Sequence, residues 1–382
     1  MARKLQSDKW LFLATLALIC TSIVMVYSAS ALVALERFQQ PYLFVTKQMV
    51  WAAIGFAVMS IVMRIDYRTY RNDKMIWLLL GAVGLMLVAV LFSRPINGTK
   101  RWFGVGGFGI QPSELAKLAA IVFTAMILER RRARINELSY SLVPIGLIVG
   151  GLCALILLQP DFGTAVSLMV VVSVMVFAAG ISYRYLAGAA LLAVPALYVI
   201  LMQADYRRRR LLTFMDPWAD PLGDGFQIIQ SLIAVGTGGV FGKGLMQGVQ
   251  KLFYLPEPFT DFIFSVISEE TGLIGASLVV LCFCVIAWRG MRTAMRAPDS
   301  FGAFLALGIT MMLVLQAFVN ISVVLGLLPT KGIPLPLVSN GGSSMLINLL
   351  GIGVLLNISQ HSRGPHDADF ASRGGQMETG AA

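Results

Sequence analysis

The chain is poor in charged residues and has almost no histidine. Only 13% of its 382 residues are charged and 57% are hydrophobic, while the 2 histidines, His361 and His366, lie close to the C-terminus. So little polar surface cannot cover a soluble globule of this size, and the composition therefore predicts a polytopic membrane protein. It also excludes histidine-based catalysis and zinc chemistry from the membrane part of the chain.

Cysteine is scarce as well, and the sequence contains 4 of them. Cys20, Cys153, Cys282 and Cys284 all lie within apolar runs, which predicts small core residues rather than disulfides or metal ligands. The formal net charge is +10, but the basic residues are scattered over the loops between apolar segments. Membrane topology explains most of these residues better than a nucleic-acid partner does.

Long apolar runs dominate what remains, and about ten of them predict membrane-spanning helices, because a span needs roughly 20 mostly apolar residues. We therefore expect an all-α membrane domain over residues 1–360. The first run is too long for a signal peptide and lacks a small-residue cleavage site, so we expect it to be retained as a helix. The predicted spans are 10–33, 44–63, 75–92, 113–128, 142–159, 164–179, 185–202, 262–288, 301–325 and 344–359.

Lysine and arginine residues set the orientation that we expect. More of them fall on the N-terminal side of the membrane than on the other side, which places both termini in the cytoplasm. The longest loop, 203–260, then lies outside the cytoplasm between the seventh and eighth spans, and its mixture of glycines, a basic cluster and an amphipathic piece predicts short helices over a cavity. Residues 361–382 are polar and glycine-rich, which predicts a disordered cytoplasmic tail.

The stretch Tyr254 to Gly275 sets carboxylates, among them Glu257 and Asp261, against long apolar segments. Two prolines before position 259 forbid a helix, and the run from Phe262 is compatible with one, so Asp261 is expected at a helix N-terminus. An ionisable residue in such surroundings marks a functional site by default. The other interpretation is an acid in the first turn, favoured by the helix dipole.

The loop 93–113 is rich in glycine and contains Lys100, Arg101 and Trp102. Such a loop either holds an anionic head group at the membrane surface or is a turn with an aromatic anchor and two solvated cations. Just beyond it, Glu114 and Lys117 are spaced i, i+3 at the start of the fourth span, which predicts a pair on one helix face. Inside a membrane such a pair must face the bundle interior or a cavity.

Two further loops return polar residues to the same side of the membrane. Asp161 precedes a glycine in a short connection, where an aspartate either serves the turn or belongs to a site. Residues 329–344 contain three prolines and three glycines, so this segment is expected to be a structured outer loop that leads into the last span.

Taken together, these motifs resemble the SEDS family (shape, elongation, division, sporulation) of polytopic peptidoglycan glycosyltransferases. The resemblance covers about residues 10–359, and four features favour its division branch over its elongation branch: DPWADP, GTGGVFGKGL, Gln250–Lys251 and PTKG. Two positions depart from the family pattern, because Phe259 stands where histidine is frequent and Asn340 where tyrosine is frequent. The motifs are NGTKRW at 97–102, QPSELAKL at 111–118, QPDFGT at 159–164, DPWADP at 216–221, the block at 254–275 and LLPTKGIPLPLVSNGGSS at 327–344.

The resemblance implies polymerisation of lipid II at the outer face of the bacterial cytoplasmic membrane, with Asp261 as the catalytic residue and general base. It makes Lys100, Arg101, Lys117 and Lys251 candidates for binding the pyrophosphate leaving group. The full set of substrate-binding residues that it implies is Lys100, Arg101, Trp102, Gln111, Ser113, Glu114, Lys117, Asp161, Lys251, Glu257, Thr260, Lys331, Ser339, Gly341, Gly342 and Ser343.

The resemblance also implies accessory components and leaves two alternatives open. A divalent cation, Mg²⁺ or Mn²⁺, at Asp261 or Asp161 is expected without any organic cofactor. The expected partners are lipid II, the nascent glycan, a monofunctional class B penicillin-binding transpeptidase, other division proteins at the septum and membrane lipids, but no nucleic acid. A lipid II flippase would use a similar bundle with interior charges. A scaffold for division proteins is the third class.

Overall fold

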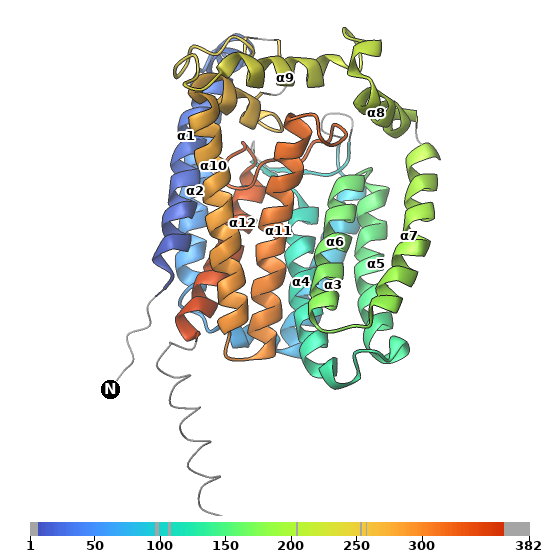
Figure 1. Cartoon of the computed structure of the whole chain (residues 1–382). Coiled ribbons are helices and arrows are strands. Elements are labelled where there is room, and N and C mark those ends of the chain that lie inside the picture. Colours follow the sequence, from blue (N-terminus) through green and yellow to red (C-terminus); the bar gives the residue numbers. More distant parts are fainter. Residues whose placement is uncertain are drawn as a thin grey trace, which may run out of the picture.

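Each of the ten predicted spans coincides with a helix. The computed structural model describes residues 7–95, 99–105, 108–203, 205–252, 254–256 and 258–362. Within these residues the long helices run between the two ends of one bundle, and the described ends of the chain, Ser7 and Ser362, lie at the same end (Figure 1). The helices are α1 (Lys9–Phe38), α2 (Leu43–Val62), α3 (Asp73–Leu91), α4 (Pro112–Arg131), α5 (Val143–Leu158), α6 (Phe162–Ala178), α7 (Tyr183–Gln203), α10 (Ile263–Arg296), α11 (Ser300–Val324) and α12 (Gly342–His361).

The all-α polytopic fold is therefore confirmed, whereas the number of membrane crossings stays a prediction. Seven helices of the described residues are long and apolar enough to span a membrane by length and composition, and α4, α6 and α7 are not among them. Helix α6 has only 17 residues. Helix α4 carries Glu114 and Lys117, together with further charges at its other end, but its residues from Pro112 to Leu128 are nearly all buried within the bundle.

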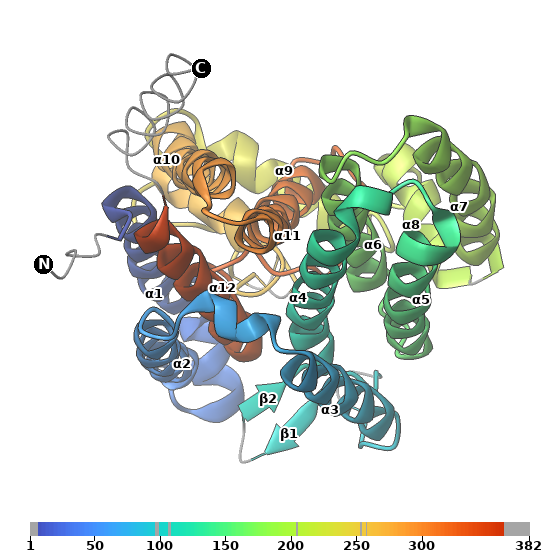
Figure 2. The ribbon, with the colours of Figure 1, turned by 90° about the horizontal axis from the view of Figure 1, so that it is seen from below.

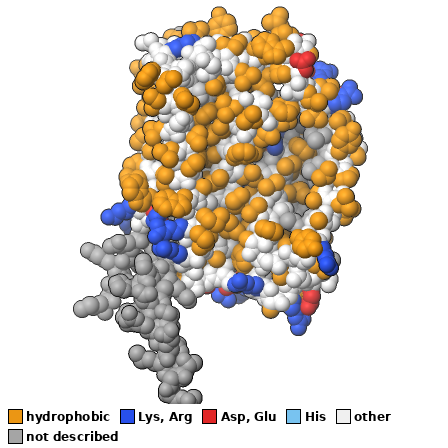
Figure 3. Space-filling view, in the orientation of Figure 1, with side chains coloured by type: hydrophobic (Ala, Val, Ile, Leu, Met, Phe, Trp, Pro, Cys, Tyr) orange, Lys and Arg blue, Asp and Glu red, His pale blue; other side chains and the backbone are white. Residues whose placement is uncertain are grey.

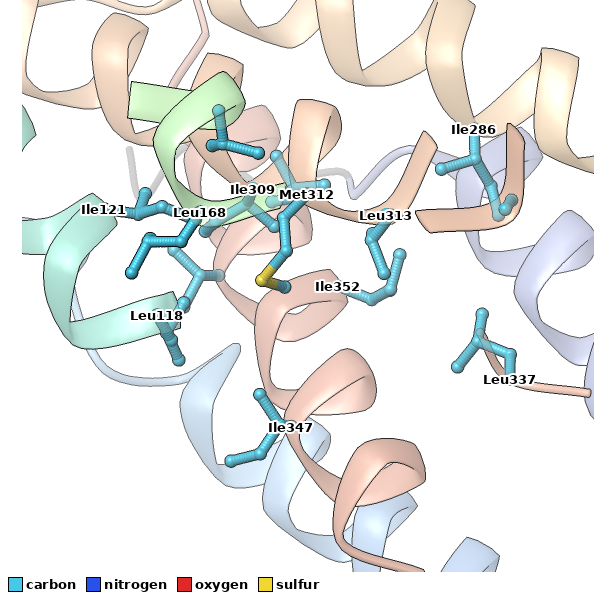
Figure 4. Close-up of a cluster of buried hydrophobic side chains, with 14 of the residues drawn as sticks. Leu118, Ile121, Leu168, Ile286, Ile309, Met312, Leu313, Leu337, Ile347 and Ile352 are labelled. Atoms are coloured by element: carbon cyan, nitrogen blue, oxygen red, sulfur yellow. The ribbon is translucent and has the colours of Figure 1, made fainter. Parts of the chain in front are cut away.

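Helices α4, α11 and α12 form the centre of the bundle, with α1, α2 and α10 on one side and α3, α5 and α6 on the other (Figure 2). Their facing sides are filled by branched apolar residues such as Ile121, Ile309 and Ile352, which are fully buried (Figure 4). Helices surrounded by lipid are held together largely by van der Waals contacts between such side chains, because lipid tails provide no hydrophobic driving force for association. Any polar side chain on these three helices must therefore find a partner inside the bundle.

The four cysteines show that apolar sequence alone does not reveal which face of a helix points into the bundle and which faces lipid. Cys153 is buried, but Cys20 and Cys284 are exposed on the outer surface and Cys282 is half-buried, so the prediction of core positions is wrong for Cys20 and Cys284. Figure 3 shows hydrophobic side chains across the flank of the bundle. A lipid-facing side chain is as apolar as a core side chain, because lipid tails are as apolar as leucine.

The polar end of the bundle opposite the termini is covered by short elements, as predicted for the long loop. Between α7 and α10 the described residues contain α8 (Asp205–Met215), a 3₁₀ turn (Pro217–Ala219) and α9 (Phe226–Gly238) (Figure 1). The loop before α4 forms a small antiparallel hairpin of β1 (Phe103–Val105) and β2 (Phe108–Ile110), which the sequence analysis did not predict.

Helix α10 is broken at Gly272, whose φ of 65° and ψ of −165° are non-helical. The glycine-rich segment after α9 lies against this break. Lys243 N donates to the carbonyl of Glu269, and Leu273 N donates to the carbonyl of Gly239. The segment thus forms hydrogen bonds with backbone groups on both sides of the break. Without it, a helix break inside a membrane would leave these groups unpaired.

Two buried carboxylates at the break hold the same loop by their side chains. Glu269 pairs with Lys243 at 2.7 Å, and Glu270 pairs with Lys251 at 2.6 Å. Both carboxylates are fully buried and also accept bonds from backbone N–H groups of the loop, so their charges are well compensated. The Glu269–Glu270 pair of the sequence therefore anchors the loop to the first part of α10.

Candidate functional site

A polar cavity of about 330 Å³ lies at the end of the bundle that carries α8 and α9. It is enclosed by the first turns of α4 and α6, by the segment before α10, by the loop before α12 and by one face of α11. Half of the residues that line it were predicted as site residues from the sequence. The lining residues are Thr99, Arg101, Trp102, Gln111, Glu114, Lys117, Asp161, Thr164, Ser167, Thr260, Asp261, Gln316, Gly332, Ile333, Pro334, Asn340, Gly341 and Ser344.

Asp261 lies at the position predicted for it, directly before Phe262, the N-cap residue of α10. Its side chain is half-buried, and its backbone carbonyl accepts a hydrogen bond of 2.8 Å from Asn320 Nδ2. A Cβ atom on Gly332 would lie 2.8 Å from Asp261 Oδ2, so the loop before α12 passes very close to this carboxylate. Glycine at position 332 thus leaves the carboxylate open to the cavity.

Glu114 and Lys117 form the predicted pair on the face of α4 that lines the cavity. Lys117 Nζ lies 2.9 Å from Glu114 Oε1, and the two side chains are 6% and 4% exposed. The same ammonium group donates to Gln316 Oε1 at 2.8 Å. The charge of Lys117 is therefore balanced locally by Glu114, while the second oxygen of Glu114 has no hydrogen-bond partner among the described residues.

Asp161 serves both interpretations that the sequence left open. As the N-cap of α6 it accepts bonds from the backbone N and the hydroxyl of Thr164, at 3.3 and 2.8 Å. It also lines the cavity and accepts a bond of 3.2 Å from Gln111 Nε2. Gln111 in turn donates to Ser113 Oγ at 2.9 Å and to Ser343 Oγ at 3.2 Å, so these predicted residues connect α4, α6 and α12.

Lys331 and Arg101 converge on the turn that precedes α6. Arg101 donates to the carbonyl oxygens of Gln159, at 2.8 Å, and Pro160. The ammonium group of Lys331 lies 5.8 Å from the centre of the Phe162 ring. Its side chain occupies the space that a Cβ atom on Gly163 would fill, which explains the glycine at that position.

Two arginines of α8 extend this cation cluster. Arg207 stacks over the ring of Phe162 at 5.5 Å, and Arg210 Nη1 donates to the carbonyl of Thr330 at 3.4 Å. Burial lowers the pKa of Lys331 to about 8, Asp161 opposes this shift, and Arg101 and Arg210 add to it. The low pKa reflects mainly the burial of the ammonium group, and the neighbouring arginines add to the shift, so a bound anion would stabilise the charged form of Lys331.

Several of the predicted substrate-binding residues do not line the cavity, and Lys331, which lies against Phe162 beside it, is among them. Lys251 is bound to Glu270 and borders a separate cavity of about 100 Å³ beside Arg37, so its assignment as a pyrophosphate ligand is corrected. Lys100 is exposed and does not line the cavity. Glu257 lies outside the described residues.

Other predicted residues support the cavity rather than face it. Ser339 is buried, accepts a bond from Leu335 N at 2.8 Å and donates to the carbonyl of Thr260. Gly342 leaves room for the ring of Trp51, which a Cβ atom would meet at 2.1 Å. The two departures from the family pattern are neighbours, since the backbone N of Asn340 donates to the carbonyl of Phe259 at 2.9 Å.

Sequence reasoning missed Gln316 and Asn320 on α11. Both are buried, and both bind the carbonyls of the loop before α12. A signal existed, because two amides four residues apart in an otherwise apolar helix are costly in a membrane and mark an interior face.

The residues of the cavity do not form a metal site by themselves. Among the described residues no group of three or more His, Cys, Asp or Glu side chains could hold an ion. Asp161 already accepts bonds from Thr164 and Gln111. The predicted Mg²⁺ or Mn²⁺ therefore lacks a protein-only set of ligands here.

Comparisons with known proteins match nearly the whole chain. Residues 9–364 match the model of the FtsW/RodA/SpoVE family, described as cell cycle protein. The probable peptidoglycan glycosyltransferase FtsW of Geobacter sulfurreducens is 44% identical over 94% of this chain and 96% of its own length. Stage V sporulation protein E of Bacillus subtilis is 43% identical over 94% of this chain and 99% of its own length.

Solved structures agree with this fold. One is a chain of a peptidoglycan synthase complex, described under structural coordination of polymerization and crosslinking, with a TM-score of 0.77 and 31% identity over 93% of this chain and 98% of that chain. Another is the rod shape determining protein RodA of Thermus thermophilus, with a TM-score of 0.70 and 27% identity over 94% of this chain and 99% of that one.

Proposed function

Since the chain belongs to the FtsW/RodA/SpoVE family of cell cycle proteins, we propose that it is a peptidoglycan glycosyltransferase that polymerises lipid II into glycan strands. The observation that carries this proposal is the polar cavity at one end of an apolar bundle, which Asp261 lines together with Arg101 and Lys117, while Lys331 packs beside it against the ring of Phe162. Glycosyl transfer from a diphosphate donor needs both a base and cations.

Asp261 is the base of this mechanism. The 4-hydroxyl oxygen of the acceptor sugar attacks the anomeric carbon of the donor, and the bond from that carbon to the diphosphate oxygen breaks. The proton of the hydroxyl group passes to the carboxylate of Asp261. The nearby glycine at position 332 leaves space for a sugar next to this carboxylate. General-base assistance is typically worth about 10²–10⁴ in rate.

The diphosphate leaving group is assigned to Arg101 and Lys331, with Arg207 and Arg210 of α8 beside them. These groups carry net positive charge at the place where negative charge develops, and fixed cations in a partly dry site stabilise it strongly. Lys117 is a weaker candidate for this role, because Glu114 balances its charge at 2.9 Å. We assign the Glu114–Lys117 pair to hydrogen bonds with a sugar.

A divalent cation would take part of its ligands from the diphosphate, as Mg²⁺ often does, and Asp261 is the carboxylate best placed to share it. It would supply further charge neutralisation of the leaving group. Asp161 is less suitable because its oxygens already accept three hydrogen bonds.

The setting that we infer is the septum of a bacterial cytoplasmic membrane, with the cavity on the outer face. A class B penicillin-binding transpeptidase is the partner that we propose, since a similar chain forms part of a synthase complex that couples polymerization and crosslinking. Other division proteins and membrane lipids complete this setting. A flippase requires its site to face each side in turn, whereas the charged residues of this cavity gather at one end of the bundle.

The direct test replaces Asp261 by asparagine. We expect Asp261→Asn to lose at least about 100-fold in polymerisation rate, because the amide keeps the shape of the side chain but cannot accept the proton. The purified variant, with and without the transpeptidase, is incubated with lipid II and the glycan ladders are quantified.

The matched control is Asp216→Asn, which changes an exposed N-cap aspartate outside the cavity to another good capping residue. This control should polymerise at the wild-type rate and show the same melting temperature. An Asp261→Asn protein that keeps more than about a tenth of the wild-type rate would contradict the assignment of Asp261 as the general base.

A further inference from the structure

Helix α11 carries two buried amides, Gln316 and Asn320, on the face that it turns towards the cavity. They are 4% and 1% exposed and stand four residues apart, so they lie one above the other on the helix. The residues around them in α11 are apolar. A buried amide without hydrogen-bond partners destabilises a fold. The hydrogen bonds that Gln316 and Asn320 make therefore indicate their role.

Each amide joins one charged part of the cavity to the loop before α12. Gln316 Nε2 donates to the carbonyl of Pro334 at 3.0 Å, while its Oε1 accepts from Lys117 at 2.8 Å. Asn320 Nδ2 donates to the carbonyl of Ile333 at 2.7 Å and to the carbonyl of Asp261 at 2.8 Å. One face of one helix therefore holds both Lys117 and Asp261.

The loop takes these donors from α11 because its own N–H groups are few and are bonded elsewhere: Ile333 N donates to the carbonyl of Lys331, and Leu335 N donates to Ser339 Oγ. Two prolines, Pro334 and Pro336, have no N–H group, and the segment forms no helix or strand between Lys331 and Val338. The same loop brings Gly332 next to the carboxylate of Asp261. Any shift of the loop relative to α11 would change the space in front of that carboxylate.

We propose that Gln316 and Asn320 are positioning residues that fix Asp261 and Lys117 relative to each other across the cavity. Asn320 does not line the cavity, so it acts through Asp261 and through the loop. This inference rests on the proposed function, since it concerns the geometry of the same base. A displacement of about 1 Å at a reacting group costs on the order of 100-fold in rate.

The test removes the donors of Asn320 and keeps the volume of its side chain. Asn320→Leu should lower kcat for lipid II polymerisation by about 10- to 100-fold and change KM by less than about twofold, because the cations that hold the diphosphate remain in place. Asn320→Asp keeps the shape and, as a neutral acid, one donor. It should therefore retain an intermediate kcat.

Asn357 provides the control for a merely structural amide. It is buried at the opposite end of the bundle on α12, where its Nδ2 donates to Met63 O at 2.9 Å and its Oδ1 accepts from Tyr67 N at 2.9 Å. Asn357→Leu loses comparable bonds, so it should lower the melting temperature to a similar degree. Its kcat per folded molecule should stay at the wild-type value.

The outcomes separate this inference from the proposed function. Equal kcat values for Asn320→Leu and Asn357→Leu, beside an inactive Asp261→Asn, would overturn the positioning role alone. Full activity of Asp261→Asn would overturn the proposed function and this inference with it. If Asn320→Leu does not fold, the comparison rests on Asn320→Asp, and a wild-type kcat for that variant would contradict the inference.

Discussion

Lys331 is the residue whose protonation the structure connects most directly to activity. Its pKa is lowered from 10.5 to about 8, mainly by burial. A lysine is charged below its pKa, so Lys331 loses its positive charge as the pH rises through about 8. We therefore expect kcat/KM to fall on the alkaline side of pH 8, because the diphosphate loses one of its cations.

Stability should change in the opposite direction over the same range. Between about pH 8 and 10.5 the unfolded chain holds the Lys331 proton more tightly than the folded protein does, so this residue raises the free energy of unfolding with pH. The measurement is the pH profile of kcat/KM for wild type and Lys331→Arg. Arginine stays charged, so the fall of kcat/KM in Lys331→Arg should occur at a higher pH than in the wild type. If kcat/KM falls at the same pH in both proteins, the titration belongs to a group other than Lys331.

At the scale of the element, the break in α10 connects the long loop to the base. Gly272 has backbone angles that glycine alone adopts easily, and a Cβ atom there would lie 2.3 Å from Gly242 N. We expect Gly272→Ala to lower the free energy of unfolding by at least about 1–3 kcal/mol, the usual cost of such a conformation. Polymerisation should fall too, since the first half of α10 begins nine residues before the break, at Ile263, and Asp261 lies directly before its N-cap residue.

The control for this variant is Gly236→Ala in the interior of α9, where a Cβ atom meets nothing within 4 Å. Alanine in that helix should be neutral or stabilise by about 0.5–1 kcal/mol. Thermal unfolding in detergent and limited proteolysis of the loop 203–260 measure both variants. A Gly272→Ala protein as stable as Gly236→Ala would contradict the role of the break.

At the scale of the whole molecule, the enzyme and the flippase differ in sidedness. Leu222 is 88% exposed at the end that carries α8 and α9, and the side chain of Arg134 is 67% exposed after α4, at the end where the termini lie. In a Cys-free background, Leu222→Cys should react with an impermeant maleimide on intact cells. Arg134→Cys should react only after permeabilisation, because the lysines and arginines place that end in the cytoplasm.

The same labelling is then repeated with Thr260→Cys at the cavity, with and without lipid II. An enzyme that acts on one face predicts labelling from outside in both conditions. Labelling of Thr260→Cys from the cytoplasmic side would favour alternating access and contradict the glycosyltransferase assignment of this cavity.

The positions of the helices, and half of the residues that line the cavity, can be predicted from local patterns in the chain. Spans are local features, because every turn of a helix in lipid must be apolar and must satisfy its own backbone bonds. For the same reason Asp261 was placed correctly at the start of α10 and the Glu114–Lys117 pair on one face of α4, since both depend only on neighbours in the chain.

Which polar groups meet depends on the packing of helices that are distant in the chain. Lys251 and Lys331 look alike in sequence, yet Lys251 is paired with Glu270, whereas Lys331 lies against Phe162 and Gly163 at the start of α6. Gln316 reaches Lys117 across 199 positions of the chain. Partners so far apart are chosen by the packing of α4, α11 and the loop before α12, and no local pattern encodes that packing.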